Sequence, residues 1–367
     1  MTTGPLQTAK LRVIATRDWI NSLPSSGTFL VVLLPLLALY LATASRDVQN
    51  IDSIAAAAPA WRLATHGDLD LDQFEGLPWI IETEGGFRSN RQPGVILFGV
   101  PFYLASDSEL SGSLPPLTPA AVAGAMSAAL AMAVLHLAFR RLTNPTTAVV
   151  AAFIGGTATA TWRISADQLW PHGPTQLWLA LGVLTLAAGW YFRSGLMLGL
   201  AILTRPITAV AAAAIGLVYG GLARRLRPIV LIGAGAAAGL VGLMAYNQGV
   251  FDSFSPTTSA YGDQFTSQAG AGGTTGYLSN LGGFFFDPAN SLFLWSPFLL
   301  VLAFGIPRAW RAAPSWVRAA AVSGAIYLLV HAALNRQSGG LQRNYRYPLE
   351  MLTLAAPLLL LAYEKLV

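Results

Sequence analysis

The strongest constraint on this chain is a series of long apolar runs separated by short polar stretches. Runs of about 20 apolar residues match the ~30 Å hydrocarbon core of a bilayer. Hydrophobic residues make up 54% of the sequence and charged residues 11%, against roughly 25% charged residues in an average soluble domain. We therefore predict an all-α integral membrane protein. The runs cover residues 28–44, 119–139, 146–162, 174–192, 194–223, 228–246, 291–306, 317–335 and 347–363.

The orientation of these runs follows from the Lys and Arg residues between them, because positive loops stay in the cytoplasm. The basic clusters all fall on one side if residues 94–105 lie at the interface and if run 194–223, broken at Thr204-Arg205-Pro206, crosses twice or not at all. Two short helices that meet at this break are the preferred interpretation. We thus expect about ten transmembrane helices in a single domain over 1–367, with both ends cytoplasmic and the first helix uncleaved.

Four polar pieces then face outward, and they hold most of the acidic residues. The first should contain juxtamembrane helices, and the third, rich in Gly, Ser and Thr, should be mobile. The chain has no cysteine, which excludes disulfides and thiolate chemistry, and its scattered basic residues do not indicate nucleic-acid binding. The four outer pieces are residues 45–118, 163–173, 247–290 and 336–346.

Two aspartates in the first outer piece are candidate catalytic acids or bases. Asp52 precedes an alanine-rich helix that Gly67 can end. At this position an aspartate fits an N-cap and a catalytic base equally well, and one residue can serve as both. Asp47 has the weaker case, because its neighbour Arg46 fits a simple membrane-edge anchor.

The second outer piece adds Asp167, Trp170 and His172 within a few residues. Asp167 fits either a second site carboxylate or a solvated loop acid, and the site is slightly favoured. His172 lies between Pro171 and Pro174, which argues against a buried histidine on a helix face. A hydrogen-bonding or proton-handling role is therefore favoured for it. Trp170 also suits an interfacial aromatic belt.

The arginines on the outer face indicate that this face binds an anion. Arg205 lies in an apolar run, where a charge costs at least ~2.5 kcal/mol, and the adjoining Pro206 favours anion binding over snorkelling. The last outer piece carries Arg336, Arg343 and Arg346 on the side where positive charge is normally depleted. That placement favours phosphate binding over a lipid-headgroup anchor.

Carboxylates and guanidinium groups on one face suit sugar transfer from a lipid phosphate. A carboxylate accepts the proton of an attacking hydroxyl, and guanidinium groups stabilise the departing phosphate. Since the phosphate leaves as an anion, one base suffices for a single inverting displacement.

Six segments of the chain follow one another in an order that resembles a known family, the membrane glycosyltransferases of the GT-C fold. This family includes protein mannosyltransferases, aminoarabinose transferases and bacterial cell-envelope enzymes. Each segment is degenerate alone, and their order carries the resemblance. The segments are Asp52–Gly67, Ser89–Tyr103, Gln168–Pro174, Gly199–Pro206, Tyr246-Asn247 and Gly339–Pro348.

The resemblance implies a polyprenyl-phosphate-linked sugar as donor, used with inversion on the extracytoplasmic face of a membrane. It implies that Asp52, rather than Asp47, is the base and that Arg205 and the last-loop arginines contact the phosphate. The matching segments also give four candidate substrate-binding residues, which are Arg91, Trp170, Asn247 and Tyr345.

The chain also departs from the family. The first loop lacks the acidic pair of some subfamilies, so no metal ligand is assigned and a divalent metal stays an open alternative. No soluble domain follows to recognise an acceptor, which leaves a glycan, a lipid or a protein possible. The Ala, Gly and Arg bias suits a bacterial inner membrane protein surrounded by membrane lipids.

Two other functions fit the same residues. A transporter or flippase for a lipid-linked saccharide would use Arg205 and the broken run 194–223 as a pathway, although the one-sided polar groups argue against it. A non-catalytic subunit of an envelope complex would keep the fold without a pocket that joins Asp52 to the arginines.

Overall fold

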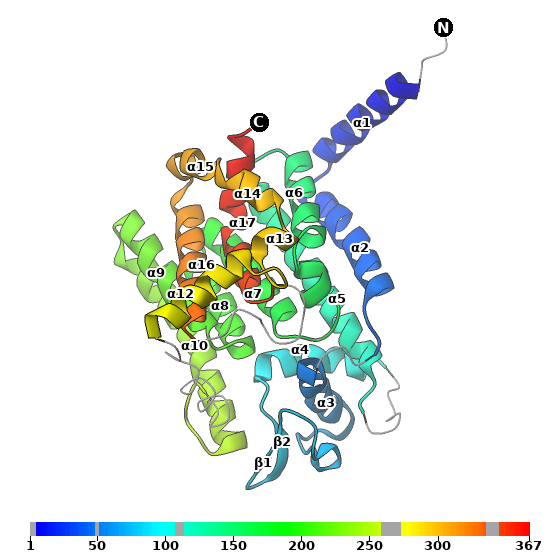
Figure 1. Cartoon of the computed structure of the whole chain (residues 1–367), viewed down its shortest axis with the longest axis vertical. Helices are drawn as coiled ribbons and strands as arrows, with labels where there is room; N and C mark the ends of the chain where they lie inside the picture. The colour runs from blue at the N-terminus through cyan, green and yellow to red at the C-terminus, as the bar shows by residue number, and fades with distance from the viewer. Residues whose placement is uncertain (1–4, 48–50, 107–113, 258–272, 335–344) are drawn as a thin grey trace.

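The computed structural model describes residues 5–47, 51–106, 114–257, 273–334 and 345–367, and these form a helical bundle (Figure 1). Among the described residues, four helices are long and apolar enough to cross a membrane, and several shorter apolar helices accompany them. An all-α membrane fold is thereby confirmed. The four long helices are α2 (Ser25–Thr43), α5 (Leu117–Phe139), α10 (Leu226–Phe251) and α16 (Ser315–Leu334).

The remaining bundle helices begin and end where the sequence has helix-terminating residues. Proline occupies the first turn of α6 and α17, where its missing N–H costs no hydrogen bond. Asn144 caps α6 by accepting a hydrogen bond from the Thr147 amide. These helices are α1 (Pro5–Ser22), α6 (Pro145–Thr157), α7 (His172–Ala187), α8 (Tyr191–Thr204), α9 (Thr208–Ala223) and α17 (Pro348–Glu364).

Helix α5 lies at the centre of one half of the bundle and packs against α2, α6 and α7. Its buried face is rich in alanine, so neighbouring backbones approach closely, as is usual between membrane helices. The second half is built around α8 and α10, with α9 and α16 beside them. Helices α7 and α17 contact both halves and carry residues of the site described below.

At one end of the bundle, the lower end in Figure 1, a small extramembrane layer covers the helices. Helix α3 (Ile51–His66) packs on α4 (Pro93–Leu104), and Gly67 ends α3 at φ 77°, a left-handed conformation that favours glycine. A two-stranded antiparallel hairpin follows, β1 (Ile80–Thr83) and β2 (Gly86–Ser89), preceded by the 3₁₀ turn η1 (Asp72–Phe74). The juxtamembrane helices expected in residues 45–118 are thus α3 and α4.

The break in run 194–223 is present, but run 291–306 differs from expectation. Helix α8 ends at Thr204 and α9 begins at Thr208. Run 291–306 is not one helix, because Pro297 has no amide to continue a helix past Ser296. It forms two short helices, α13 (Leu292–Trp295) and α14 (Phe298–Ala303), and a third, α15 (Ile306–Ala312), begins at its last residue.

The third outer piece is also more ordered than the sequence indicated. Helix α10 extends to Phe251, and α12 (Gly273–Phe286) follows, so two parts of the segment that we expected to be mobile are helical. Residues 258–272, where the expectation was strongest, lie outside the described residues.

The contact between α8 and α10 depends on a glycine and gives a stability prediction. A Cβ at Gly239 would collide with the backbone of Gly199, whereas a Cβ at Gly233 on the same helix would meet nothing within 4 Å. We expect Gly239→Ala to destabilise the protein by about 1–3 kcal/mol through overpacking. Gly233→Ala should be neutral or stabilising by up to about 1 kcal/mol, because alanine favours helix.

Thermal unfolding in detergent micelles measures both variants. Equal melting temperatures for Gly239→Ala and Gly233→Ala would contradict the close approach of α8 and α10.

Candidate active site

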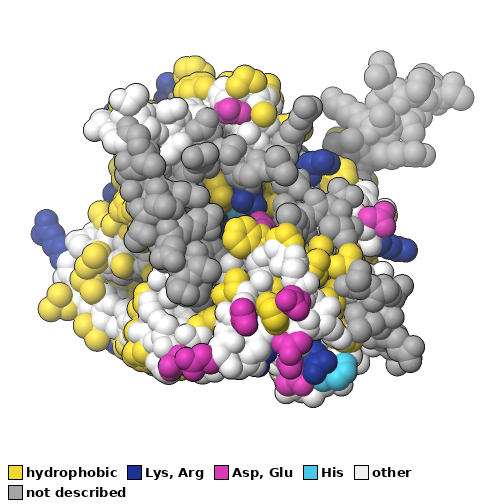
Figure 2. Space-filling model, turned by 60° about the horizontal axis from the view of Figure 1, so that its bottom comes forward, with side chains coloured by type: hydrophobic (Ala, Val, Ile, Leu, Met, Phe, Trp, Pro, Cys, Tyr) yellow, Lys and Arg dark blue, Asp and Glu magenta, His cyan; other side chains and the backbone are white. Residues whose placement is uncertain are grey.

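A cavity of about 570 Å³ lies where the extramembrane layer meets the bundle. Figure 2 shows the corresponding end of the molecule, with a hollow in which dark blue and magenta side chains are visible. Residues far apart in sequence meet here because α3, the segment after β2, the α8–α9 break and the start of α17 converge. The polar and aromatic lining comprises Asp52, Trp79, Asn90, Arg91, Gln92, Trp170, His172, Arg205, Asn247, Thr257, His331, Arg346 and Tyr347.

Asp52 lies in the first turn of α3 and is paired with two arginines. Its Oδ1 lies 2.7 Å from Nη2 of Arg91, and its Oδ2 lies 3.0 Å from Nη1 of Arg346. The side chain is 18% exposed. Since α3 begins at Ile51, Asp52 is a first-turn residue rather than the N-cap that the sequence allowed. A helix N-terminus still favours its negative charge.

The pKa of Asp52 reflects this environment. Burial alone would raise the pKa, but the neighbouring guanidinium groups of Arg91 and Arg346 outweigh burial and lower the pKa below the ordinary value of an aspartate. Asp52 is therefore ionised at neutral pH. Its basicity depends on where the Arg91 and Arg346 side chains lie.

Arg205 follows the last residue of α8 and turns into the bundle, where it is paired with Glu350. Its Nη1 lies 2.6 Å from Oε1 of Glu350, which is fully buried on α17. Its Nη2 lies 2.7 Å from Nε2 of His331, and its guanidinium lies 5.5 Å from the centre of the Tyr347 ring. Two opposite charges from two apolar runs thus pair with each other through Oε1 of Glu350, which offsets part of the cost of placing either charge there.

His172 joins this buried pair. Its Nδ1 lies 2.8 Å from Oε1 of Glu350 and 2.7 Å from Nη1 of Arg205. One ring nitrogen cannot donate to Glu350 and accept from Arg205 at the same time, so the tautomer decides which bond forms. The expectation that His172 is not a buried helical histidine is wrong. It begins α7, and proline is tolerated in a first helical turn.

Arg346 connects Asp52 to the aromatic side of the cavity. Its guanidinium lies 5.4 Å from the centre of the Trp170 ring and 4.9 Å from that of Tyr347, and its Nη2 donates to the Tyr347 hydroxyl at 3.0 Å. Planar guanidinium groups stack on such rings while keeping donors free for an anion. Arg346 is thus held at the cavity wall.

Other candidates from the sequence lie outside the cavity lining. Asp47 is exposed, and its backbone carbonyl accepts a bond from Gln168. Asp167 accepts a hydrogen bond from the Ser45 amide at 2.8 Å, and burial raises its pKa. Tyr345 uses its hydroxyl to bind the Ala160 amide and Ser296. The side chains of Asp167 and Tyr345 and the backbone of Asp47 fix loops next to the site. Arg336 and Arg343 lie outside the described residues.

The remaining substrate-binding candidates do line the cavity. Arg91 is described above with Asp52, and Trp170 packs against Arg346. Asn247 is also a lining residue, and its side-chain amide donates to the Ser255 carbonyl at 2.7 Å.

Sequence reasoning missed Glu350, His331, Tyr347 and Asn90. Glu350 and His331 lie in apolar runs opposite Arg205, and an intramembrane ionisable residue implies a partner, which is the signal that identifies them. Asn90 is buried and lines the cavity. The nitrogen and oxygen of its side-chain amide have no hydrogen-bond partner among the described residues. Within the same residues no cluster of three or more His, Asp or Glu side chains has the geometry of a metal site.

No protein-family model matches the chain, and no curated protein matches its sequence significantly. Solved structures do match. ArnT from Cupriavidus metallidurans bound to undecaprenyl phosphate superposes with a TM-score of 0.56 at 18% identity, over 92% of this chain and 59% of that chain. The apo ArnT structure gives a TM-score of 0.55 at 17% identity, over 92% and 58%.

The Archaeoglobus fulgidus oligosaccharyltransferase with a tethered acceptor peptide gives a TM-score of 0.58 at 14% identity, over 95% of this chain and 50% of that chain. Both proteins are GT-C glycosyltransferases, and the chain therefore has the GT-C fold of a multi-pass membrane protein. It spans between half and three fifths of the length of these proteins.

The buried pair gives the second prediction. Glu350→Gln leaves the Arg205 guanidinium without its counter-charge, and we expect a loss of about 3–5 kcal/mol in unfolding free energy. Asp18→Asn is the control, because Asp18 and Arg17 form an exposed pair that should matter little. Thermal unfolding in detergent measures both variants.

A double variant sharpens this test. Replacing Arg205 by Gln as well removes the unpaired charge, so the double variant should be more stable than Glu350→Gln alone. Equal losses for Glu350→Gln and Asp18→Asn would contradict the pairing.

Proposed function

We propose that this protein is a glycosyltransferase that moves a sugar from a polyprenyl-phosphate donor to an acceptor hydroxyl at the outer face of a bacterial inner membrane. One observation carries the proposal: a carboxylate and two arginines from distant parts of the chain, Asp52, Arg205 and Arg346, line one cavity. The GT-C fold of the chain supports it. The acceptor would be an envelope glycan, lipid or protein.

The charges around the cavity suit one phosphate. Among the described residues, three guanidinium groups face two carboxylates, which leaves one net positive charge if the histidines are neutral. Their pairings are Arg91 and Arg346 with Asp52, and Arg205 with Glu350. A polyprenyl-phosphate-linked sugar is a phosphodiester with one negative charge, so it would neutralise the site.

The proposed reaction is a single displacement. Asp52 accepts the proton of the acceptor hydroxyl while the oxygen of that hydroxyl attacks the anomeric carbon of the sugar. The bond between that carbon and the phosphate oxygen breaks, and its electron pair goes to the phosphate. Arg205 and Arg346 stabilise the additional negative charge of the polyprenyl phosphate product. Attack opposite the leaving group inverts the anomeric centre.

Donor binding would also activate the base. Arg346 bridges Asp52 and the aromatic wall, so a phosphate that draws the Arg346 guanidinium toward itself weakens the ion pair with Asp52. Losing this favourable charge would raise the pKa of Asp52 and make it a better proton acceptor. The base would then be strongest when the donor is in place.

The donor chain would lie along the apolar part of the same cavity. Beyond Arg205, the lining continues with apolar residues. They are Ile207 just before α9, Val210 of α9, Leu243 of α10 and Leu334 of α16. Apolar side chains beside a charged pocket suit a lipid phosphate with its hydrocarbon attached. The cavity lies at the α3 end of the bundle, and this position supports use of the donor in the outer leaflet.

A flippase is less well supported than a transferase. A translocation pathway needs polar groups toward both faces of the membrane. The charged lining residues lie near α3 and the hairpin, and a second cavity toward the other end has no charged lining among the described residues. A non-catalytic subunit is also disfavoured, because a pocket joins Asp52 to the arginines.

Removal of the base gives the third prediction. Asp52→Asn should reduce sugar transfer by at least about 100-fold, the lower range for general-base catalysis, while binding of the polyprenyl-phosphate-sugar persists. Asp47→Asn is the matched control in the same loop, because Asp47 is exposed and lies outside the cavity. Transfer to an acceptor in proteoliposomes measures both.

Wild-type transfer by Asp52→Asn would remove the proposed base. Lipid translocation without transfer in the wild-type protein would favour the flippase instead.

The lowered pKa of Asp52 gives the fourth prediction. Because the folded pKa of Asp52 lies below the ordinary value of an aspartate, the protonation of Asp52 should limit kcat/KM only at lower pH than an ordinary aspartate would. Arg91→Gln removes the largest favourable charge and raises the pKa, so the acidic limb should move to higher pH. Arg91→Lys keeps the charge and should move it less.

Profiles of kcat/KM from pH 4 to 9 measure the acidic limbs. The same limb in both Arg91 variants would contradict control of the Asp52 pKa by Arg91.

A further inference from the structure

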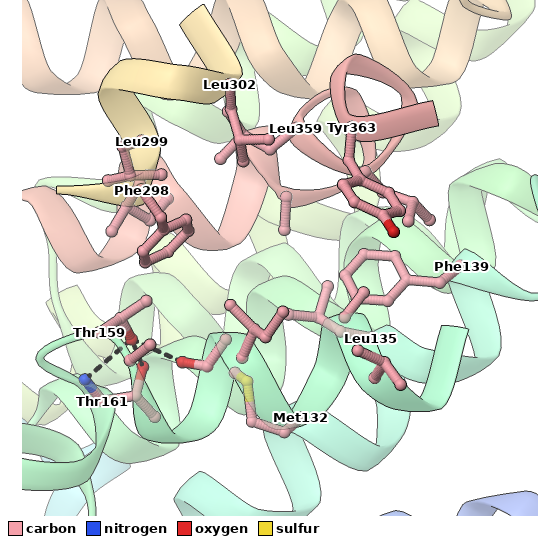
Figure 3. Close-up of a pocket in the computed structure, with 18 of the residues that line it drawn as sticks. Met132, Leu135, Phe139, Thr159, Thr161, Phe298, Leu299, Leu302, Leu359 and Tyr363 are labelled. Carbon is pink, nitrogen blue, oxygen red and sulfur yellow. Dashed lines mark hydrogen bonds between the residues drawn. The ribbon is translucent and has the colours of Figure 1, made fainter. Parts of the chain in front are cut away.

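A second cavity, of about 710 Å³, lies between α5, α6, α14 and α17 and belongs to no part of the site above. None of the residues that line it is charged, and none lines the first cavity. Figure 3 shows Phe139 and Tyr363 at one end and Thr159 and Thr161 at the other, with Leu299 and Leu302 of α14 on one wall. We call this cavity the α6 slot.

The α6 slot is long and narrow because of its lining. Its residues on α6 run from Thr146 to Gly155, and Ala158 follows the helix. The slot therefore follows nearly the whole of a 13-residue helix, which is roughly 20 Å long. Small side chains make the space, notably Ala151 and Gly155 of α6 and Ala356 of α17. A linear hydrocarbon chain fits this shape.

The slot offers a ligand no unmet polar group at its inner end. The Thr159 hydroxyl donates to the Gly155 carbonyl at 2.6 Å and lies 2.9 Å from the Thr161 hydroxyl, and the Gln176 amide donates to Thr161 and to Thr353. A ligand therefore needs no polar atoms there. The contacts available are those of an alkyl chain.

The slot opens sideways to the membrane because run 291–306 is broken. Helix α14 has six residues and packs on α17, leaving the gap toward α6. Apolar side chains at the opening are well exposed, with Ile154 42% and Val301 61% accessible. In a bilayer such an opening faces acyl chains.

One end of the slot is basic. The Thr146 hydroxyl donates to the Asn21 side chain at 2.9 Å and lies 3.3 Å from the Arg17 carbonyl, and the Arg17 side chain is 60% exposed. Lys365 follows Tyr363 by two residues, and exposed Arg308 lies on α15, which packs on α17.

Two acids face the same end, Asp18 beside Arg17 and Glu364 beside Lys365, so the balance of these five groups is positive. A headgroup with a net negative charge suits this end better than a zwitterionic headgroup, whose cation offsets its phosphate.

A buried wall separates the slot from the candidate active site. Ala160, Trp170, Tyr345 and Leu352 belong to one buried cluster, with Leu352 on the slot side and Trp170 on the site side. The donor chain has its own apolar lining along α9, α10 and α16. The slot is therefore separate from the donor position.

We propose that the α6 slot binds one acyl chain of an anionic glycerophospholipid, with its headgroup at the basic end beside Tyr363. The lipid fills the gap between α6 and α14 and stabilises the broken segment α13–α15. This proposal does not depend on the proposed enzymatic function, because it uses no residue of the first cavity.

Lipid retention tests the proposal. The protein is purified in mild detergent, delipidated, and mixed with dioleoyl phosphatidylglycerol or dioleoyl phosphatidylcholine for native mass spectrometry and thermal unfolding. We expect wild type to retain one phosphatidylglycerol in preference to phosphatidylcholine and to melt at higher temperature with it. Ala151→Phe and Ala356→Phe fill the slot and should reduce this retention by about tenfold or more.

Ala237→Phe is the matched control, because Ala237 is an exposed alanine on α10, away from the slot. It should bind phosphatidylglycerol as wild type does. At least one of Ala151→Phe and Ala356→Phe should elute as a single folded species. If that variant retains as much phosphatidylglycerol as wild type, the proposal is overturned. Equal binding of both lipids, or a polyprenyl phosphate that is lost only from the slot variants, would overturn it as well.

Discussion

A guanidinium group cannot stay unpaired among apolar helices, and the architecture of this site follows from that constraint. Arg205 sits at the break between two apolar helices and is paired at 2.6 Å with Glu350, which is buried on another apolar helix. Neither residue is tolerable alone, since breaking a buried pair costs about 3–5 kcal/mol. The pair therefore fixes α17 against the α8–α9 break and, through His172 and His331, ties α7 and α16 to the same point. Four segments are held around a cavity by one charge interaction.

The second ion-pair group has a different character. Asp52 and its two arginines lie at the cavity surface rather than in the bundle, and Asp52 remains partly exposed. We propose that the Arg205–Glu350 pair stays in place, whereas Arg346 exchanges Asp52 for the donor phosphate and keeps its contacts with Trp170 and Tyr347. In the proposed reaction this difference separates a rigid phosphate anchor from a carboxylate whose basicity changes when the donor binds. Two separate apolar surfaces would bind hydrocarbon chains in these proposals. One lies beside the site and takes the donor chain, and the other is the α6 slot, which takes an acyl chain.

The sequence predicted the membrane class, the break at Arg205 and Asp52 as the favoured carboxylate, because each depends on local chemistry. Three patterns can be recognised without knowledge of tertiary contacts: long apolar runs, a proline beside a buried cation, and an acid before an alanine-rich helix. The sequence did not predict Glu350 or His331, whose role exists only opposite Arg205. Asp167 and Tyr345 lie outside the cavity lining and bind neighbouring backbone, and the sequence alone does not distinguish such loop residues from site residues, because both carry the same side chains. The division of run 291–306 was missed because hydropathy alone outweighed Pro297.

The central claim is that Asp52, Arg205 and Arg346 surround one lipid phosphate. A structure determined by electron cryomicroscopy with added polyprenyl phosphate tests it most directly. The account predicts phosphate density within hydrogen-bonding distance of Arg205 and Arg346, with the Arg346 guanidinium moved away from Asp52 and the hydrocarbon along α9 and α10. Phosphate density outside this cavity, or lipid bound while the Asp52–Arg346 pair is unchanged and far from the phosphate, would contradict it.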